Sequence, residues 1–245
     1  MNSRCAFVVL CLGLLTTPAF SAGYDRSETT KLYSVRLRVP EAAMAISAVK
    51  TVVFARFKKE TDEIKSDAAN DKQDEPDNFH PFALDTNWRV TFESAKVLSL
   101  SADIYSDMNG AHPNQEFDTI VWDKFANCDV LIATLFAKGQ AVAAMHAIAD
   151  RAGKSWEKIY AKRSGDAPGQ EIYDKAKDGI APDSEHLKHY ALTYAKGQSN
   201  ANGIVLLYGA GAVWPHAAGN FRLSVPVSVF GKYLSPEWKP VFGIP

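Results

Sequence analysis

Cysteine is scarce in this 245-residue chain, which contains only three. Cys5 and Cys11 lie in an N-terminal segment that we expect to be removed, so Cys128 remains alone. One thiol cannot form an internal disulfide, which excludes a disulfide-stabilised scaffold. Because Cys128 lies beside an apolar run, we expect a half-buried small residue. The alternative is an intermolecular disulfide or a nucleophile, although no motif supplies the nearby base that a cysteine nucleophile needs.

A long hydrophobic run is also missing. The apolar stretch at residues 6–15 is shorter than the about 20 residues of a membrane-spanning helix, and no second long run follows. Arg4 precedes the stretch, and Ala19 and Ser21 occupy the small-residue positions of a cleavage site. These features predict a secretory signal peptide, residues 1–21, and a periplasmic or secreted protein. A non-cleaved anchor is the alternative.

Neither sign of charge is in excess. The chain has 27 basic and 28 acidic residues, and loss of Arg4 with the signal leaves a formal charge of 26 − 28 = −2. Nucleic-acid-binding proteins usually carry a strong basic excess, so we exclude nucleic acid as the partner. Hydrophobic residues make up 47% and charged residues 22% of the chain, as in an ordinary globular protein.

Recognisable catalytic and cofactor motifs are absent. There is no nucleophile elbow, no Walker loop and no HExxH zinc motif, so we predict no catalytic set, no cofactor and no metal. His186 and His189 could share a metal on one helix face, but zinc needs three or four ligands and no third is fixed by spacing. Gly209-Ala210-Gly211 follows a strand, and we interpret it as a tight turn because no lysine or helix signature follows.

The hydrophobic pattern of residues 22–80 predicts a small strand–helix unit. Residues 32–39 alternate as in a half-buried strand, and residues 41–65 carry one apolar helix face. We expect residues 22–30 to be frayed, because they are polar. The acidic stretch at residues 62–77 is interpreted as a solvated helix end and linker, since it lacks the glycine of a calcium loop.

Residues 81–245 mix strands and helices without strict alternation. This order favours an α+β fold, in which the small strand–helix unit precedes a larger mixed domain with a mainly antiparallel sheet. We expect strands at 88–92, 97–105, 115–122, 190–194, 203–208 and 221–226, and helices at 138–163 and 171–177.

Two loops combine histidine, proline and small residues. One is Asn109-Gly110-Ala111-His112-Pro113-Asn114, and the other is residues 213–219 with Trp214 and His216. They could line one surface and bind a ligand. Alternatively, the small residues permit a tight chain path and each histidine ties its loop by hydrogen bonds.

These loops carry a family resemblance. From Tyr105 to His112 the chain resembles the Tyr-x-x-x-Gly-Gly-Ala-His signature of a bacterial domain of unknown function, with Asn109 in place of the first glycine. That domain forms the C-terminal part of the extracytoplasmic region of the RsiV anti-sigma factor and also occurs in some peptidoglycan deacetylases. Residues 131–136, 214–219 and 233–236 resemble further segments of the family in the same order.

The resemblance covers about residues 88–245, and residues 32–65 resemble the smaller domain that usually precedes it. It implies an α+β fold. In RsiV this region recognises lysozyme, and deacetylase chemistry belongs to a separate catalytic domain. The resemblance therefore implies an exported binding protein for a lysozyme-like hydrolase or for peptidoglycan. The expected binding residues are Tyr105, Asn109, Gly110, His112, Trp214 and His216.

Two other functions stay open. The chain could be an enzyme acting on cell wall or saccharide, with His112 and His216 as acid and base, which requires their loops to converge. It could also be an immunity or structural protein with a dedicated partner.

Overall fold

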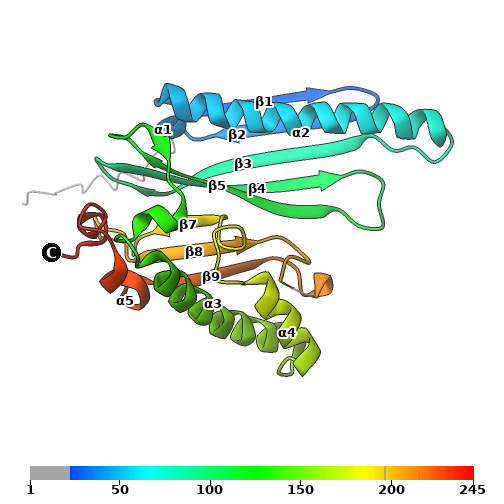
Figure 1. Ribbon diagram of the computed structural model, residues 1–245. Helices are drawn as coiled ribbons and strands as arrows, with labels where there is room; N and C mark the ends of the chain where they lie inside the picture. Colours follow the sequence, from blue (N-terminus) through cyan, green and yellow to red (C-terminus); the bar gives the residue numbers. More distant parts are fainter. Residues whose placement is uncertain (1–22, 196, 214) are drawn as a thin grey trace, which may run out of the picture.

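The computed structural model describes residues 23–195, 197–213 and 215–245. The predicted signal peptide, residues 1–21, and Trp214 of the expected binding set lie outside the described residues. Within them, Figure 1 shows four layers in the order helix α2, a large sheet, a small sheet, and helices α3 and α4. The α+β prediction is confirmed, since helices and mostly antiparallel strands occur together.

The large sheet is formed by the first six strands in chain order. All neighbouring pairs are antiparallel except β2–β3, because α2 carries the chain back between those two strands. Its elements are β1 (Tyr24–Thr29), β2 (Tyr33–Val39), α1 (Glu41–Met44), α2 (Ser47–Asp74), β3 (Phe82–Glu93), β4 (Val97–Asp107), β5 (Asn114–Asp123) and β6 (Cys128–Asp129).

The small sheet is antiparallel and has the order β7-β8-β9. The central position of β8 agrees with its apolar sequence on both faces. Its elements and those around it are η1 (Ile132–Leu135), α3 (Ala141–Ser164), α4 (Gln170–Gly179), β7 (Tyr190–Thr193), β8 (Gly203–Tyr208), η2 (His216–Ala218), β9 (Phe221–Pro226), α5 (Val227–Phe230), η3 (Gly231–Tyr233) and η4 (Lys239–Phe242).

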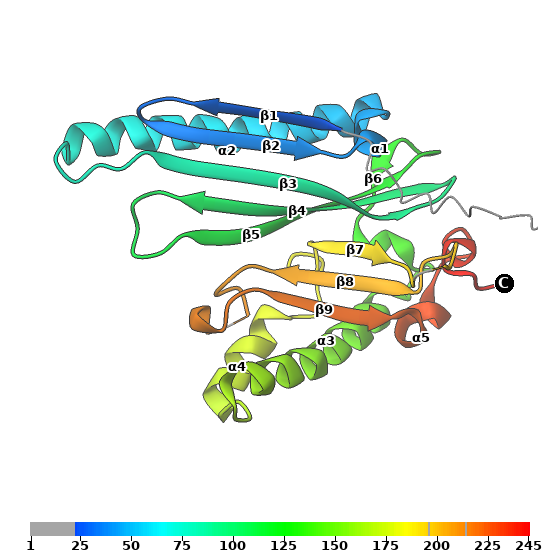
Figure 2. The same cartoon turned by 180° about the vertical axis from the view of Figure 1, so that it is seen from behind.

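Because side chains alternate along each strand, the large sheet has buried apolar residues on both faces, and they belong to separate core clusters. On one face of the large sheet, residues such as Leu37, Trp88 and Leu100 pack under Val49 and Val53 of α2. The main core lies between the small sheet and the helices on its outer side, and it extends to one end of the large sheet. Each sheet therefore has a helix on its outer face and meets the other sheet on its inner face (Figure 2).

A β-bulge decides where the two sheets meet. The register between β3 and β4 shifts between Val90 and Phe92, so that Phe92 lies opposite Ser99. This places the Phe92 ring on the face that points away from α2, where it joins Val121 in the main core. Near the bulge the small sheet covers Ser99 and Ser101, and farther along the strands the same face carries Asp85 and Asp103, which line a cleft.

Three expectations were wrong. Residues 24–29 form strand β1 because they pair with β2, although nothing apolar marks them. Helix α2 continues through the acidic stretch to Asp74, since Ile64 and Ala68 are buried against the sheet. Cys128 is exposed, because it pairs at the short outer strand β6 and not inside the core.

The expected boundary between residues 80 and 81 lies between two paired strands of the large sheet, because β2 before it pairs with β3 after it over six residues. None of the helices in the described part of the chain is long and apolar enough to cross a membrane.

Among the residues that the structure describes, Trp156 of α3 is the largest fully buried side chain, and its Nε1 donates to the Val213 carbonyl at 3.0 Å. We expect Trp156→Ala to lower the free energy of unfolding by about 3–5 kcal/mol, because it leaves a cavity and an unpaired carbonyl. Urea denaturation measures this. Val142→Ala on the same helix is the control, since Val142 is 64% exposed, and it should change stability by less than about 0.5 kcal/mol. A Trp156→Ala loss as small as that of the control would contradict the core assignment.

Candidate functional site

The large sheet has a polar face that points away from α2. Because side chains alternate along a strand, this face receives every second residue of β2 to β5. Register places Asp85 opposite Tyr105 and Asn87 opposite Asp103, and Arg38 of β2 lies beside Asn87. Three of these side chains are partly exposed: Asp85 is 36%, Tyr105 37% and Asp103 38% exposed. They remain open to a ligand.

A cleft of about 630 Å³ lies between this face and the small-sheet layer. Asp85, Asp103 and Tyr105 line it from the large sheet. Arg163 of α3 and Arg222 of β9 line it from the opposite side. Its size falls within the roughly 300–1,000 Å³ range of small-molecule sites.

Guanidinium and carboxylate groups alternate within the cleft. Arg38 Nη2 donates to Asp85 at 2.7 Å, and Asp103 forms ion pairs with both Arg89 and Arg222. Burial lowers the pKa of the Arg89 and Arg222 guanidinium groups from their ordinary value. The cleft therefore combines apolar surface with ion-paired Arg38, Asp85, Asp103 and Arg222, which suits a ligand with hydroxyl and amide groups.

The two histidine loops meet beside the cleft. The ring centroids of His112 and His216 are 4.4 Å apart, with the ring planes tilted by 30°. Close by, Asn220 Nδ2 donates to Gln115 Oε1 at 3.1 Å, and both of these residues line the cleft. The convergence that the enzyme hypothesis requires is therefore present in the structure.

Two glycines allow this approach. Gly211 has φ of 87°, and a Cβ there would lie 3.2 Å from the His216 ring. A Cβ on Gly209 would lie 3.0 Å from the Gln115 carbonyl oxygen, so the loop after β8 rests directly on the start of β5. A side chain at Gly209 would push the loop after β8 away from β5, and one at Gly211 would displace the His216 ring within its own loop.

Arg163 fixes the other end of the second loop. Its guanidinium donates to the carbonyls of Ala218 and Asn220 at 2.6 and 2.8 Å, and it lies 4.6 Å from the centroid of the Phe221 ring. Helix α3 thus holds the segment that carries His216 (orange in Figure 1).

The expected binding residues fall into three groups. Tyr105 lines the cleft, while His112 and His216 contact each other beside it. Asn109 has φ of 60°, and its Nδ2 donates to Asp71 and to the His80 carbonyl, so it ties the first loop to α2 and to the segment before β3. Gly110 is exposed on the same turn. The role of all these residues in binding stays a prediction.

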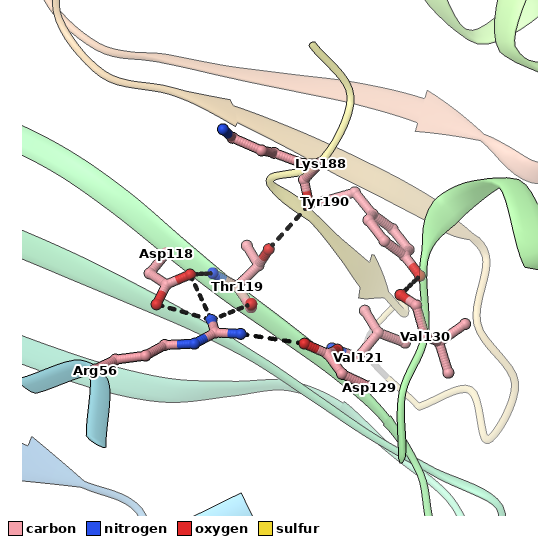
Figure 3. A network of polar contacts seen from close by, with 8 residues as sticks. All are labelled: Arg56, Asp118, Thr119, Val121, Asp129, Val130, Lys188 and Tyr190. Atoms are coloured by element: carbon pink, nitrogen blue, oxygen red, sulfur yellow. Dashed lines mark hydrogen bonds and ion pairs between the residues drawn. The ribbon is translucent and has the colours of Figure 1, made fainter. Parts of the chain in front are cut away.

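Behind the cleft, Arg56 of α2 anchors the sheet from its other face (Figure 3). Its Nη1 donates to Asp118 at 2.7 Å and to the Thr119 carbonyl at 3.0 Å, and its Nη2 donates to Asp129 at 3.2 Å. Tyr190 at the start of β7 donates to the Val130 carbonyl at 2.7 Å. The junction therefore links α2, β5, β6 and the small sheet.

Acidic groups crowd this junction. Burial, with the charges of Asp118 and Glu116, raises the pKa of Glu60 from 4.5 to about 7. Burial also raises the pKa of Asp129, against the opposing effect of Arg56, and lowers the pKa of His189. Each shift disfavours the charged form of its group.

Residues 26–115 match the family model described as deacetylase PdaC. The match covers less than half of the chain, and it contributes Arg38, Asp85, Asp103 and Tyr105 to the cleft. No curated protein matches the chain significantly.

The fold of the chain is similar to that of a solved structure. The crystal structure of a DUF3298 family member from Bacteroides fragilis NCTC 9343 matches with a TM-score of 0.55 and 12% identity, covering 86% of this chain and 92% of the other. A DUF3298 family protein from Pseudomonas aeruginosa PAO1 gives a TM-score of 0.49 at 12% identity, with 88% and 94% covered. Residues 26–115 are thus similar to the PdaC model, the fold is similar to that of the Bacteroides fragilis protein, and the expected relation to RsiV stays a prediction.

Sequence reasoning missed the charged cleft residues. Arg38, Asp85 and Asp103 stand at polar positions of alternating strands, which resemble an ordinary solvated sheet face. The one available signal was that Arg38 and Arg222 each stand at a polar position of an alternating strand. Only the tertiary structure places these two strands across one cleft.

His186 and His189 both line a further pocket of about 370 Å³, but their surroundings differ. His186 Nδ1 lies 2.8 Å from Asp183, whereas His189 is partly buried near Asp118 and Arg56. Among the residues that the structure describes, no group of three or more His, Cys, Asp or Glu side chains could hold a metal ion.

The Glu60 pKa predicts a pH-dependent stability. Between pH 4.5 and about 7 the folded protein keeps a proton that the unfolded chain has lost, so the free energy of unfolding falls as pH rises through this window. We expect Glu60→Gln to remove the dependence and to be more stable than wild type at pH 8 by about 2 kcal/mol, after allowance for solvent screening. Urea denaturation at pH 4 and pH 8 tests it. If the free energy of unfolding changed between pH 4 and pH 8 by the same amount in both proteins, the raised pKa of Glu60 would be contradicted.

Proposed function

We propose that the chain is an exported binding protein of the cell envelope and that its cleft holds a saccharide-containing segment of peptidoglycan. The observation that carries the proposal is the cleft itself. It presents guanidinium, carboxylate and amide groups together with the ring of Tyr105. Such groups both donate and accept hydrogen bonds, as a chain of sugar hydroxyls and acetamido groups requires.

The shape of the site favours a glycan over a protein surface. A specific protein interface buries about 800 Å² on each partner across a broad patch. This site is a concave cleft of about 630 Å³, closer to the pockets that enclose a small ligand. Tyr105 adds a partly exposed aromatic ring, whose apolar face and polar tip suit an amphipathic ligand.

The family match also supports this proposal. The matched model takes its name from a deacetylase, and the matched residues supply the helix-backed sheet and one wall of the cleft. In the proposed role this sheet contributes ligand binding, and the predicted signal peptide brings the chain to the envelope.

Peptidoglycan sedimentation with the purified exported protein tests the proposal. We expect saturable binding that weakens at least about tenfold, or about 1.4 kcal/mol, in Tyr105→Ala and in Arg222→Ala. Phe125→Ala is the matched control, because Phe125 is 74% exposed and does not line the cleft. Circular dichroism checks that each variant is folded.

A c-type lysozyme pull-down is the companion measurement. Capture of lysozyme without peptidoglycan binding would replace this proposal with recognition of a lysozyme-like hydrolase. Equal peptidoglycan binding by all the variants would show that the cleft is not the site.

The histidine pair favours a second candidate function, an enzyme acting on cell wall or saccharide. Imidazoles 4.4 Å apart can reach one substrate, which general acid and base catalysis requires. The pair lies next to Gln115 and Asn220 at the cleft, so a bound glycan could extend to it.

For this candidate we expect release of reducing ends or acetate from peptidoglycan, with a loss of about 10²–10⁴-fold in His112→Ala or His216→Ala. His146→Ala is the control, since His146 is exposed on α3 away from the loops. Activity that survives both loop substitutions would exclude this role for the pair.

A further inference from the structure

Strand β1 leaves one edge of the large sheet open. Its backbone bonds with β2 alternate in direction, and the closing bond of this hairpin runs from Thr30 N–H to the Tyr33 carbonyl. Residues 24, 26 and 28 therefore bond to β2, while Asp25, Ser27 and Thr29 direct their N–H and C=O groups away from the sheet. Residues 25–29 are exposed.

The opposite edge of the same sheet is closed by side chains. On β5, Thr119 donates its N–H to Asp118 and accepts from Arg56 at its carbonyl. Val121 donates to Asp129 and accepts from Val130. The described residues provide no such partners for the outward groups of Asp25, Ser27 and Thr29. An open edge of this kind is a template for pairing with another strand.

If two copies of β1 paired antiparallel, charged side chains of one copy would lie opposite side chains of the other sign. In an antiparallel pair centred on Ser27, Arg26 of one copy lies opposite Glu28 of the other, and the reverse contact forms by symmetry. These are non-hydrogen-bonded positions, where opposite side chains come closest. Arg26 has no ion pair among the described residues, whereas Glu28 lies 3.3 Å from Lys65 Nζ and accepts from the Tyr33 hydroxyl, so the contact across the dimer would add a second cation to Glu28.

We propose that the chain forms a two-fold symmetric dimer in which β1 pairs antiparallel with β1 of a second copy, centred on Ser27. Asp25, Ser27 and Thr29 then form backbone hydrogen bonds with Thr29, Ser27 and Asp25 of the second copy. The two large sheets join into one, with both α2 helices on the same face.

The groove between β1 and α2 becomes part of the joint surface. It has a volume of about 410 Å³, and Phe54 and Phe57 of α2 lie along it with Tyr24 of β1. The Tyr24 and Phe54 ring centroids are 4.9 Å apart. A second copy bound at β1 would cover the open side of this groove and remove apolar surface from water.

Pairing also places both clefts on the face of the joint sheet that points away from the helices. If the proposed glycan binding holds, two sites facing one way would bind a polymer with higher avidity. The dimer itself does not depend on the ligand, so its test is separate from the binding test.

Sedimentation velocity of the purified exported protein tests the dimer. We expect a dimer in wild type and at least a tenfold weaker association in Arg26→Glu, which sets two glutamates opposite each other. The exchange Arg26→Glu with Glu28→Arg should restore association, because it recreates both contacts. Ser27→Pro should also give monomers, since its missing N–H points away from β2 and the ladder within the monomer is kept.

Cross-linking fixes the register. Ser27→Cys in a Cys128→Ser background should oxidise to a covalent dimer, because paired Cα atoms about 5.5 Å apart suit a disulfide. Ser164→Cys, exposed at the end of α3, is the control and should stay monomeric. A monomer at all concentrations would overturn the proposal, as would a dimer that persists in Ser27→Pro and is not cross-linked at Ser27. Pairing with a different extended peptide but not with itself would likewise overturn it.

Discussion

The Arg56 guanidinium is the contact on which the arrangement of layers depends. It comes from α2, and it binds Asp118 and the Thr119 carbonyl of β5 and Asp129 of β6. An arginine can satisfy several acceptors at once because its donors form a rigid planar fork. One side chain therefore fixes the helix to the sheet at the place where the small sheet joins, and it closes the β5 edge against further strands.

The cleft follows from a change of polarity along one sheet face. The bulge between Val90 and Phe92 places an apolar ring on the face away from α2, and the small sheet packs there. Past the bulge, Asp85 and Asp103 occupy the same face, and burying these charges under a second sheet would be costly. The sheets therefore meet at one end and leave a polar cleft at the other, which makes the cleft a consequence of the packing.

Long periodic segments were predictable from the sequence, because their patterns are local. The helix at residues 141–164 and the strands β4, β5, β8 and β9 follow from apolar spacing. Strand β1 and the acidic end of α2 were not, since their structure depends on partners. β1 has no apolar pattern and forms by pairing with β2, while Ile64 and Ala68 extend α2 because the sheet lies beneath them.

The sequence by itself determined the α+β class, the strand and helix order and the two histidine loops. These features depend on neighbours in the chain and on residue type. The tertiary structure decided that His112 and His216 lie 4.4 Å apart and that Arg38, Arg163 and Arg222 share one cleft. Those groups are up to 184 residues apart in the chain, from Arg38 to Arg222. Only packing between layers brings such groups together, because no local pattern encodes the distance between two strands of different sheets.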